Sequence, residues 1–285
     1  MTEVLVTGAR GQLGSDLAAK TATNWAYSSA ELDITEEASV KARLGEFAGA
    51  GGSVLFNAAA YTAVDKAESD VDAAFAVNAR GPELLANACA EFGIACVHVS
   101  TDYVFGGDAD HPYEPADPTA PNSVYGRSKL AGEQAVLAAG GHVVRTAWVY
   151  GAHGANFVRT MLRLQRERET LTVVDDQHGT PTWSADLADG LLELAAALGE
   201  RELPQLLHAS GSGQTTWCGF AKAIFTEAGA DPERVRACTT EEFPSPTARP
   251  AYSVLGDAAW RAAGLTPLPD WRDALHRAYA AGSFA

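Results

Sequence analysis

A glycine-rich turn near the N-terminus constrains the fold of this chain more than any other feature. Its three glycines recur every three residues, after a β-branched run over 3–7 and before helical spacing over 12–20. Between a strand and a helix, such glycines let the backbone approach a pyrophosphate, and the helix N-terminus offers free N–H groups. A plain β–α turn is the alternative. The turn predicts a dinucleotide site at Gly8, Gly11 and Gly14, with Arg10 inside the same turn.

Alternating strand and helix patterns continue through the first half of the chain. Further strands are expected at 25–28, 53–58, 94–100 and 142–148, and helices at 35–47, 70–92 and 123–139. Such alternation predicts an α/β fold with a Rossmann-type, doubly wound parallel sheet over residues 1–150. The Gly-, Pro- and Asp-rich stretch 106–122 is expected to be a long loop.

The second half of the chain follows a different pattern. Beyond residue 150 the alternation weakens, and prolines separate shorter elements. We interpret 151–285 mainly as a smaller C-terminal substrate-binding lobe, and leave open whether one of its strands returns to the main sheet.

Charge and composition narrow the possible partners. A formal net charge of -15 over 285 residues provides no basic stripe for a nucleic-acid backbone, so an anionic substrate needs local donors. The four cysteines form no disulfide framework, which favours reduced thiols. No basic leader with an apolar run and no membrane-length apolar segment is visible. We expect a cytoplasmic protein that binds neither nucleic acid nor membrane.

The end of the second strand bears on the choice of cofactor. An acidic residue there favours the free 2′-hydroxyl of NADH, but the strand ends in Tyr27, Ser28 and Ser29. Arg10 could pair with a 2′-phosphate, or could be an ordinary solvated charge. NADPH is therefore favoured, with NADH as the alternative. Asp33 and Ile34 are candidates to flank the adenine.

Tyr125 and Lys129 stand four residues apart near the start of a predicted helix, so both lie on one face. Reduction of a ketone leaves negative charge on oxygen and needs a proton donor. Tyrosine, with a pKa of about 10, is too weak an acid unless a nearby cation such as a lysine ammonium favours the phenolate. A solvated helix face is the alternative for an isolated Tyr-x-x-x-Lys.

Other segments support this catalytic interpretation. Thr101 follows the strand over 94–100, where a hydroxyl can donate to a substrate oxygen. Small residues after the third strand would let a cofactor lie against the backbone, and this segment comprises Ala58, Ala59, Ala60, Tyr61 and Thr62. Asn78 is a candidate to brace nearby backbone, or it faces solvent.

Together these segments resemble the dTDP-4-dehydrorhamnose reductases, a family of extended short-chain dehydrogenases/reductases. The resemblance rests on the glycine-rich turn, on 57–68, on Ser100-Thr-Asp-Tyr-Val-Phe105, on Tyr125-x-x-x-Lys129, on Arg145-Thr-Ala-Trp-Val-Tyr150, and on 176–182 and 246–250. It implies reduction of the 4-keto group of a dTDP-deoxysugar to give dTDP-L-rhamnose. Tyr125 would be the proton donor, Lys129 would bind the nicotinamide ribose, and Thr101 would complete the triad. The resemblance also implies that the cofactor contacts Gly11, Gln12, Leu13, Asp33, Ile34 and Ala58-Ala59-Ala60. Substrate contacts would come from Thr101, Asp102, Trp148 and Arg249.

Several points stay open. Relatives usually place an Asn before the Ser in the segment that reads Ala251-Tyr252-Ser253 here. Some relatives bind magnesium through glutamates at a dimer interface, but no carboxylate set here could be matched to them, and the histidines show no metal-ligand spacing. We assign no metal and expect a monomer or homodimer. Alternatives are a reductase of another dTDP-4-keto-6-deoxyhexose, such as one of the dihydrostreptose pathway, or a non-catalytic NADP-binding regulatory subunit. A dehydratase is disfavoured because Tyr103, not Glu, follows Asp102.

Overall fold

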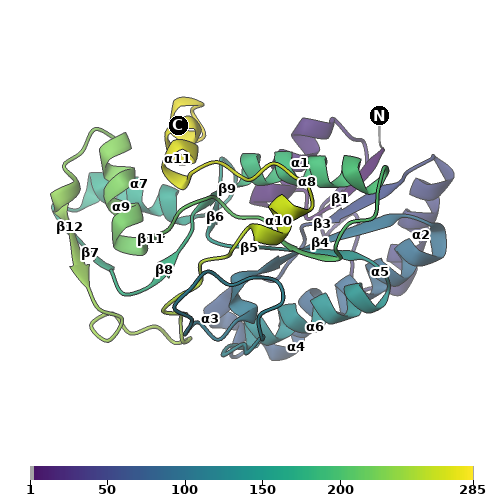
Figure 1. Cartoon of the computed structure of the whole chain (residues 1–285), viewed down its shortest axis with the longest axis horizontal. Helices are drawn as coiled ribbons and strands as arrows, with labels where there is room; N and C mark the ends of the chain where they lie inside the picture. Colours follow the sequence, from purple (N-terminus) through teal and green to yellow (C-terminus); the bar gives the residue numbers. More distant parts are fainter. Residues whose placement is uncertain (1–2, 285) are drawn as a thin grey trace.

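A six-stranded, wholly parallel sheet forms the centre of the protein in the computed structural model, which describes residues 3–284 (Figure 1). The strand order is β10-β5-β4-β3-β1-β2. The bounds are β1 Val4–Thr7, β2 Ala26–Tyr27, β3 Val54–Asn57, β4 Ala95–Thr101, β5 His142–Thr146 and β10 Leu206–His208. Every residue of β1 and β3 is buried, as expected of strands covered on both faces. The fold class expected from the sequence is confirmed.

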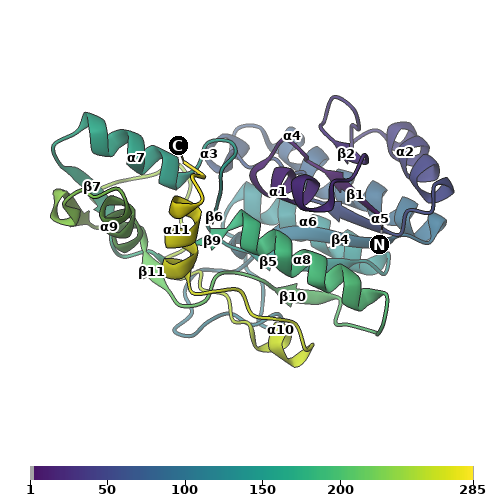
Figure 2. The same ribbon diagram turned by 90° about the horizontal axis from the view of Figure 1, so that it is seen from above.

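Helices cover both faces of the sheet (Figure 2). One layer contains α1 (Gln12–Thr21) and α8 (Ser184–Leu198), whose apolar side chains share a core with β1 and β3. The other layer contains α2 (Glu37–Gly49), α5 (Gly81–Phe92) and α6 (Val124–Ala138), which enclose a second apolar cluster. The sheet therefore separates two cores.

The helix predicted over 70–92 is confirmed in its extent, but it is not one regular α-helix, because three directly consecutive helical segments make it up. These are α4 (Val71–Phe75), a π-helical turn η1 (Ala76–Arg80) and α5. Pro82, the second residue of α5, has no N–H to donate back into the preceding helical turn, and the π turn lies directly before α5. A short helix α3 (Val64–Ala67) was also not expected. The π turn brings Asn78, which is fully buried, toward the loop after β3.

The strand predicted over 142–148 ends early. β5 stops at Thr146, and Trp148 has a φ of 45°, in the left-handed region that a non-glycine residue rarely adopts. The chain then enters β6 (Val149–Tyr150), which pairs with β9 (Thr182–Trp183) outside the main sheet. The bend at Trp148 thus directs the chain toward the C-terminal lobe.

Residues beyond 150 contribute to both parts of the molecule. β10 pairs in parallel with β5, and α8 packs on α1, so this segment returns to the main sheet. The lobe has its own core around Phe220, Phe225 and Trp271. Its elements are α7 (Phe157–Glu167), β7 (Leu171–Val174), β8 (His178–Gly179), β11 (Thr215–Thr216), α9 (Trp217–Glu227), η3 (Pro232–Arg234), β12 (Val235–Cys238) and α11 (Trp271–Ala280). The short α10 (Ala258–Ala262) lies beside β10.

The stretch 106–122 is a long loop, as the sequence predicted, and follows the 3-10 turn η2 (Asp102–Val104). Tyr113 anchors it: its hydroxyl accepts from the backbone N–H of Gly107, Asp108 and Ala109, and its ring stacks on Phe105. Over residues 3–284, the helices are too short or too polar to cross a bilayer.

Candidate active site

The glycine-rich turn lies at the carboxyl ends of β1 and β3, where the strand order reverses. Ligands of open α/β sheets bind at such a switch point. Gly8 has a φ of 71°, and a Cβ there would lie 2.7 Å from Ala59 N, so only glycine fits against the end of β3. Helix α1 begins after Gly11 with no side-chain cap, which leaves its first N–H groups free for an anion. These features fit the pyrophosphate of a dinucleotide.

The loop after β3 forms the second wall of this crevice. Asn78 holds it: its Oδ1 accepts from Tyr61 N at 2.8 Å, and its Nδ2 donates to Tyr61 O at 3.1 Å. The same Nδ2 lies 3.0 Å from Ser128 Oγ on α6. Ala58, Ala59 and Ala60 are half-buried, and Thr62 is exposed. Asn78 therefore ties the loop to the helix that carries Tyr125 and Lys129.

The end of β2 differs from the sequence interpretation in one respect. A carboxylate does stand there, because Glu31 folds back and accepts from Ser28 N at 2.9 Å and Ser28 Oγ at 2.6 Å. The hydrogen bonds from the Ser28 hydroxyl and backbone N–H lower the pKa of Glu31, and the charges of Arg10 and Arg43 add to this effect. Arg10 itself is exposed. Asp33 bonds the Thr35 backbone and hydroxyl, while Ile34 is buried in the core.

Tyr125 and Lys129 lie one turn apart at the start of α6. Ser123 caps this helix, as expected, with its Oγ accepting from Gly126 N at 3.0 Å. Both side chains are buried, and Thr101 lies at the end of β4. Burial raises the pKa of Tyr125, whereas the Thr101 hydroxyl lowers it. The structure thus brings the three predicted catalytic residues together.

Lys129 is only 2% exposed. Its Nζ donates to Val99 O at 2.7 Å and lies 3.3 Å from His98 Nε2. Burial lowers the pKa of Lys129 to about 8, and the charge of Glu133 opposes that shift. The sequence had given His98 no role, because it was grouped with the histidines that lack metal-ligand spacing. Its place within the apolar run Ala-Cys-Val-His-Val was the available signal of burial.

Asp102 is buried beside Thr101, whose Oγ1 donates to Asp102 Oδ1 at 2.8 Å. Burial raises the pKa of Asp102 to about 6, and the hydroxyls of Ser253 and Thr101 nearby oppose the shift. Its other oxygen, Oδ2, has no hydrogen-bond partner among the described residues. A buried carboxyl oxygen without a partner is costly, so it is a candidate acceptor for a sugar hydroxyl.

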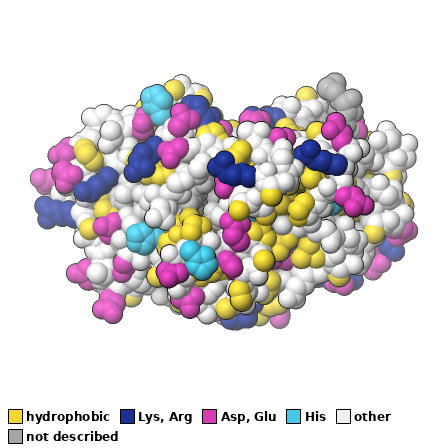
Figure 3. Space-filling model, viewed as in Figure 1, with side chains coloured by type: hydrophobic (Ala, Val, Ile, Leu, Met, Phe, Trp, Pro, Cys, Tyr) yellow, Lys and Arg dark blue, Asp and Glu magenta, His cyan; other side chains and the backbone are white. Residues whose placement is uncertain are grey.

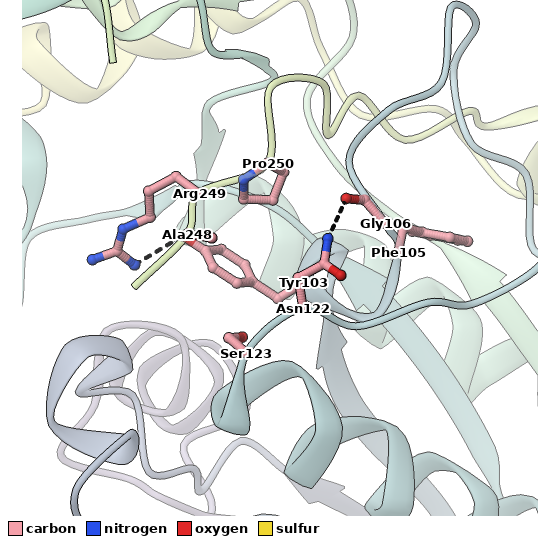
Figure 4. Close-up of a pocket in the computed structure, with 8 residues that line it drawn as sticks. All are labelled: Tyr103, Phe105, Gly106, Asn122, Ser123, Ala248, Arg249 and Pro250. Carbon is pink, nitrogen blue, oxygen red and sulfur yellow. Dashed lines mark hydrogen bonds between the residues drawn. The ribbon is translucent and has the colours of Figure 1, made fainter. Parts of the chain in front are cut away.

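Arg249 and Tyr103 line a small pocket between the C-terminal segment and the loop after β4 (Figure 4). Arg249 is already paired: its Nη2 lies 2.7 Å from Asp65 Oδ1, and its Nη1 donates to Tyr103 Oη at 3.1 Å. Trp148 is not among the lining residues. It stacks on Trp217, with ring centroids 3.5 Å apart.

Charges and potential metal ligands are scattered. On the face shown in Figure 3, basic and acidic side chains are interspersed without a continuous basic stripe. Within residues 3–284, no three His, Cys, Asp or Glu side chains form a cluster that could hold a metal ion. The four cysteines are buried and free.

Comparison with known proteins agrees with this geometry. Residues 1–283 match the family model described as RmlD substrate binding domain. A dTDP-4-dehydrorhamnose reductase from Mycobacterium tuberculosis is 50% identical over 98% of this chain and 92% of that protein. One from Streptomyces griseus is 48% identical over 97% of this chain and 93% of that protein. The solved structure of the Bacillus anthracis dTDP-4-dehydrorhamnose reductase in complex with NADP is 38% identical, with a TM-score of 0.91 over 99% of this chain and 100% of that one. The chain therefore belongs to the dTDP-4-dehydrorhamnose reductase family.

Proposed function

We propose that this protein reduces the 4-keto group of dTDP-4-dehydro-β-L-rhamnose to give dTDP-L-rhamnose, with NADPH as the reductant. The observation that carries the proposal is that Tyr125, Lys129 and Thr101 lie together at the carboxyl ends of the parallel strands. The glycine-rich turn lies at the same end of the sheet. The relatives from Mycobacterium tuberculosis and Streptomyces griseus are named dTDP-4-dehydrorhamnose reductase, which supports this activity.

The residues of this chain divide the chemistry among them. A bound dihydronicotinamide supplies the hydride that reduces the carbonyl carbon. Tyr125 donates its hydroxyl proton to the oxygen on which negative charge develops, and Thr101 donates a hydrogen bond to the same oxygen. The Lys129 ammonium favours the tyrosinate that remains. Asp102, through its unpartnered Oδ2, accepts from a hydroxyl of the sugar.

The direct test mixes purified protein with NADPH and dTDP-4-dehydrorhamnose. Loss of NADPH absorbance and an NMR spectrum of dTDP-L-rhamnose are the expected results. Turnover only with another dTDP-4-keto-6-deoxyhexose would favour the related reductase activity. Absence of turnover with any such sugar, despite NADPH binding, would favour a non-catalytic subunit.

The oligomeric state and the location in the cell stay predictions. Native mass spectrometry of the purified protein decides between a monomer and a homodimer, and a cytoplasmic location is expected.

Replacing Arg249 with alanine is expected to raise KM for the dTDP-sugar at least about tenfold and leave NADPH affinity unchanged. The guanidinium lies in the pocket beside Tyr103 and matches a diphosphate, which would displace Asp65 from it. The control is Asp65→Asn, which removes the competing carboxylate and is expected not to raise KM. An unchanged KM in Arg249→Ala protein that is folded by circular dichroism would place the diphosphate elsewhere.

Replacing Arg10 with alanine is expected to weaken NADPH binding by about ten- to a hundredfold and leave NADH binding unchanged, because a charge-assisted bond to the 2′-phosphate is lost. Glu31 disfavours that phosphate, so Arg10 is needed to offset its charge. Fluorescence titration with both cofactors measures the effect. Arg163→Ala, which removes an exposed arginine paired with Glu167 on α7, is the control. Equal losses for NADPH and NADH would exclude a 2′-phosphate role.

A further inference from the structure

His98 lies at the middle of β4, fully buried between a side chain of β3 and the amine of Lys129. Its Nδ1 is 2.9 Å from Asn57 Nδ2, and its Nε2 is 3.3 Å from Lys129 Nζ. Asn57 in turn accepts at 2.7 Å from Thr7 Oγ1 of β1. A buried polar chain therefore runs across three adjacent strands and ends at the lysine of the active site.

The orientation of the Asn57 amide is fixed by its neighbours. Its Oδ1 lies 3.2 Å from Ala59 N, and a backbone N–H can only donate. The carbonyl oxygen must therefore face Ala59 and Thr7, which leaves the Nδ2 amino group facing His98. Because this group is a donor, His98 Nδ1 must be the acceptor.

The position of the imidazole proton follows from this. Complete burial and the charge of Lys129 both lower the pKa of His98 well below its ordinary value, so the ring is neutral. A neutral imidazole carries one N–H, and with Nδ1 accepting, that N–H is at Nε2. The Nε2–H then points at Lys129 Nζ. An ammonium has only donors and cannot accept this hydrogen, whereas a neutral amine has a lone pair that can.

We propose that His98 is a positioning residue for Lys129: oriented by Thr7 and Asn57, its Nε2–H holds the amine in place and disfavours the ammonium. This inference rests on the proposed reductase function, in which Lys129 assists Tyr125. Burial alone lowers the pKa of Lys129 to about 8, and the Nε2–H of His98 acts in the same direction, so the lysine can switch between ammonium and amine near neutral pH.

Other charged and polar groups around Lys129 also bear on its protonation state. Glu133, on the same helix, favours the ammonium, and Arg145 of β5 is bonded to Glu133. Tyr125 lies one turn earlier on α6, and Asp102 follows β4. The π turn faces α6 with the neutral amide of Asn78. Two described neighbours lie within hydrogen-bond distance of Lys129 Nζ. Val99 O can only accept, so the donor to the amine is His98 Nε2–H.

The test compares His98→Leu with the matched control His98→Gln. A glutamine amide can accept from Asn57 and donate to Lys129, as the imidazole does, whereas leucine fills space without either bond. The chain has five lysines, so the 13Cε signal of Lys129 in cofactor-free protein can be followed during a pH titration. We expect the Lys129 midpoint to rise by about one pH unit in His98→Leu and to stay near the wild-type value in His98→Gln.

An unshifted midpoint in His98→Leu, or equal shifts in both variants, would overturn the inference. Imidazole 15N spectra of the wild-type protein test it without a variant: a neutral Nε2–H tautomer between pH 6 and 9 supports it, and an Nδ1–H tautomer or a charged ring overturns it. The kcat/KM profile is recorded alongside, and its basic limb is expected to move with the Lys129 midpoint. A shifted midpoint with an unmoved basic limb would uphold the role of His98 and contradict the assigned role of Lys129.

Discussion

Replacing Tyr125 with phenylalanine is expected to lower kcat by about two to four orders of magnitude, the usual contribution of a positioned general acid. The change removes one oxygen atom from a buried ring that packs edge-on against Tyr103, so the packing is kept. Only the proton donor is lost. Single-turnover kinetics with a deuterated nicotinamide measure whether hydride transfer is the step that slows.

The matched control for this variant is Tyr103→Phe. Tyr103 lies next to Tyr125 and bonds Arg249, but it is not the proposed proton donor. We expect it to affect KM more than kcat, while NADPH affinity stays unchanged in both variants. Near wild-type hydride transfer in Tyr125→Phe would remove Tyr125 from its assigned role and would leave the membership of the family untouched.

The sequence predicted those parts of the fold that local patterns determine. The glycine-rich turn, the apolar runs of β1 and β3 and the Ser123 cap all depend on residues close together in the chain. The helix over 70–92 was predicted with nearly the observed bounds, but its π turn was missed because no local pattern separates a π turn from an α turn. The bulge at η1 instead accompanies contacts that Asn78 makes with Tyr61 and Ser128, 17 and 50 residues away.

The site shows the same division between local and distant information. Tyr125 and Lys129 could be predicted because a helix fixes residues four apart on one face. The pairing of Arg249 with Asp65 could not, since 184 residues separate them. Glu31 was missed because only the observed turn folds its carboxylate back onto Ser28. The bond between His98 and Lys129 requires the register of β4 against α6, which the sequence does not contain.

A second large effect is expected from Glu133→Gln, this time on stability. Glu133 and Arg145 form a bidentate pair, with Nε–Oε1 and Nη2–Oε2 distances of 2.8 and 2.7 Å, and their side chains are only 1% and 3% exposed. Arg145 also lies over the Phe105 ring and next to His208. Burial and the charge of Arg145 together lower the pKa of His208 to about 3. With Glu133 neutral, no described neighbour offers Arg145 a countercharge. Breaking such a pair from one side is expected to cost about 3–5 kcal/mol of unfolding free energy.

Urea unfolding of the variant measures this loss, and Glu167→Gln in the exposed Arg163–Glu167 pair is the control, with an expected change within about 0.5 kcal/mol. The double variant Glu133→Leu, Arg145→Met should recover much of the stability, because no unpaired charge then remains buried. A loss in Glu133→Gln no larger than in the control would show that Arg145 finds other compensation.

The Glu133→Gln variant also affects the active site. The charge of Glu133 favours the Lys129 ammonium, so its removal should lower the Lys129 titration midpoint further. That shift has the opposite sign to the one expected from His98→Leu, and the two variants together therefore test whether Lys129 is balanced between an acidic partner on α6 and an N–H donor on β4.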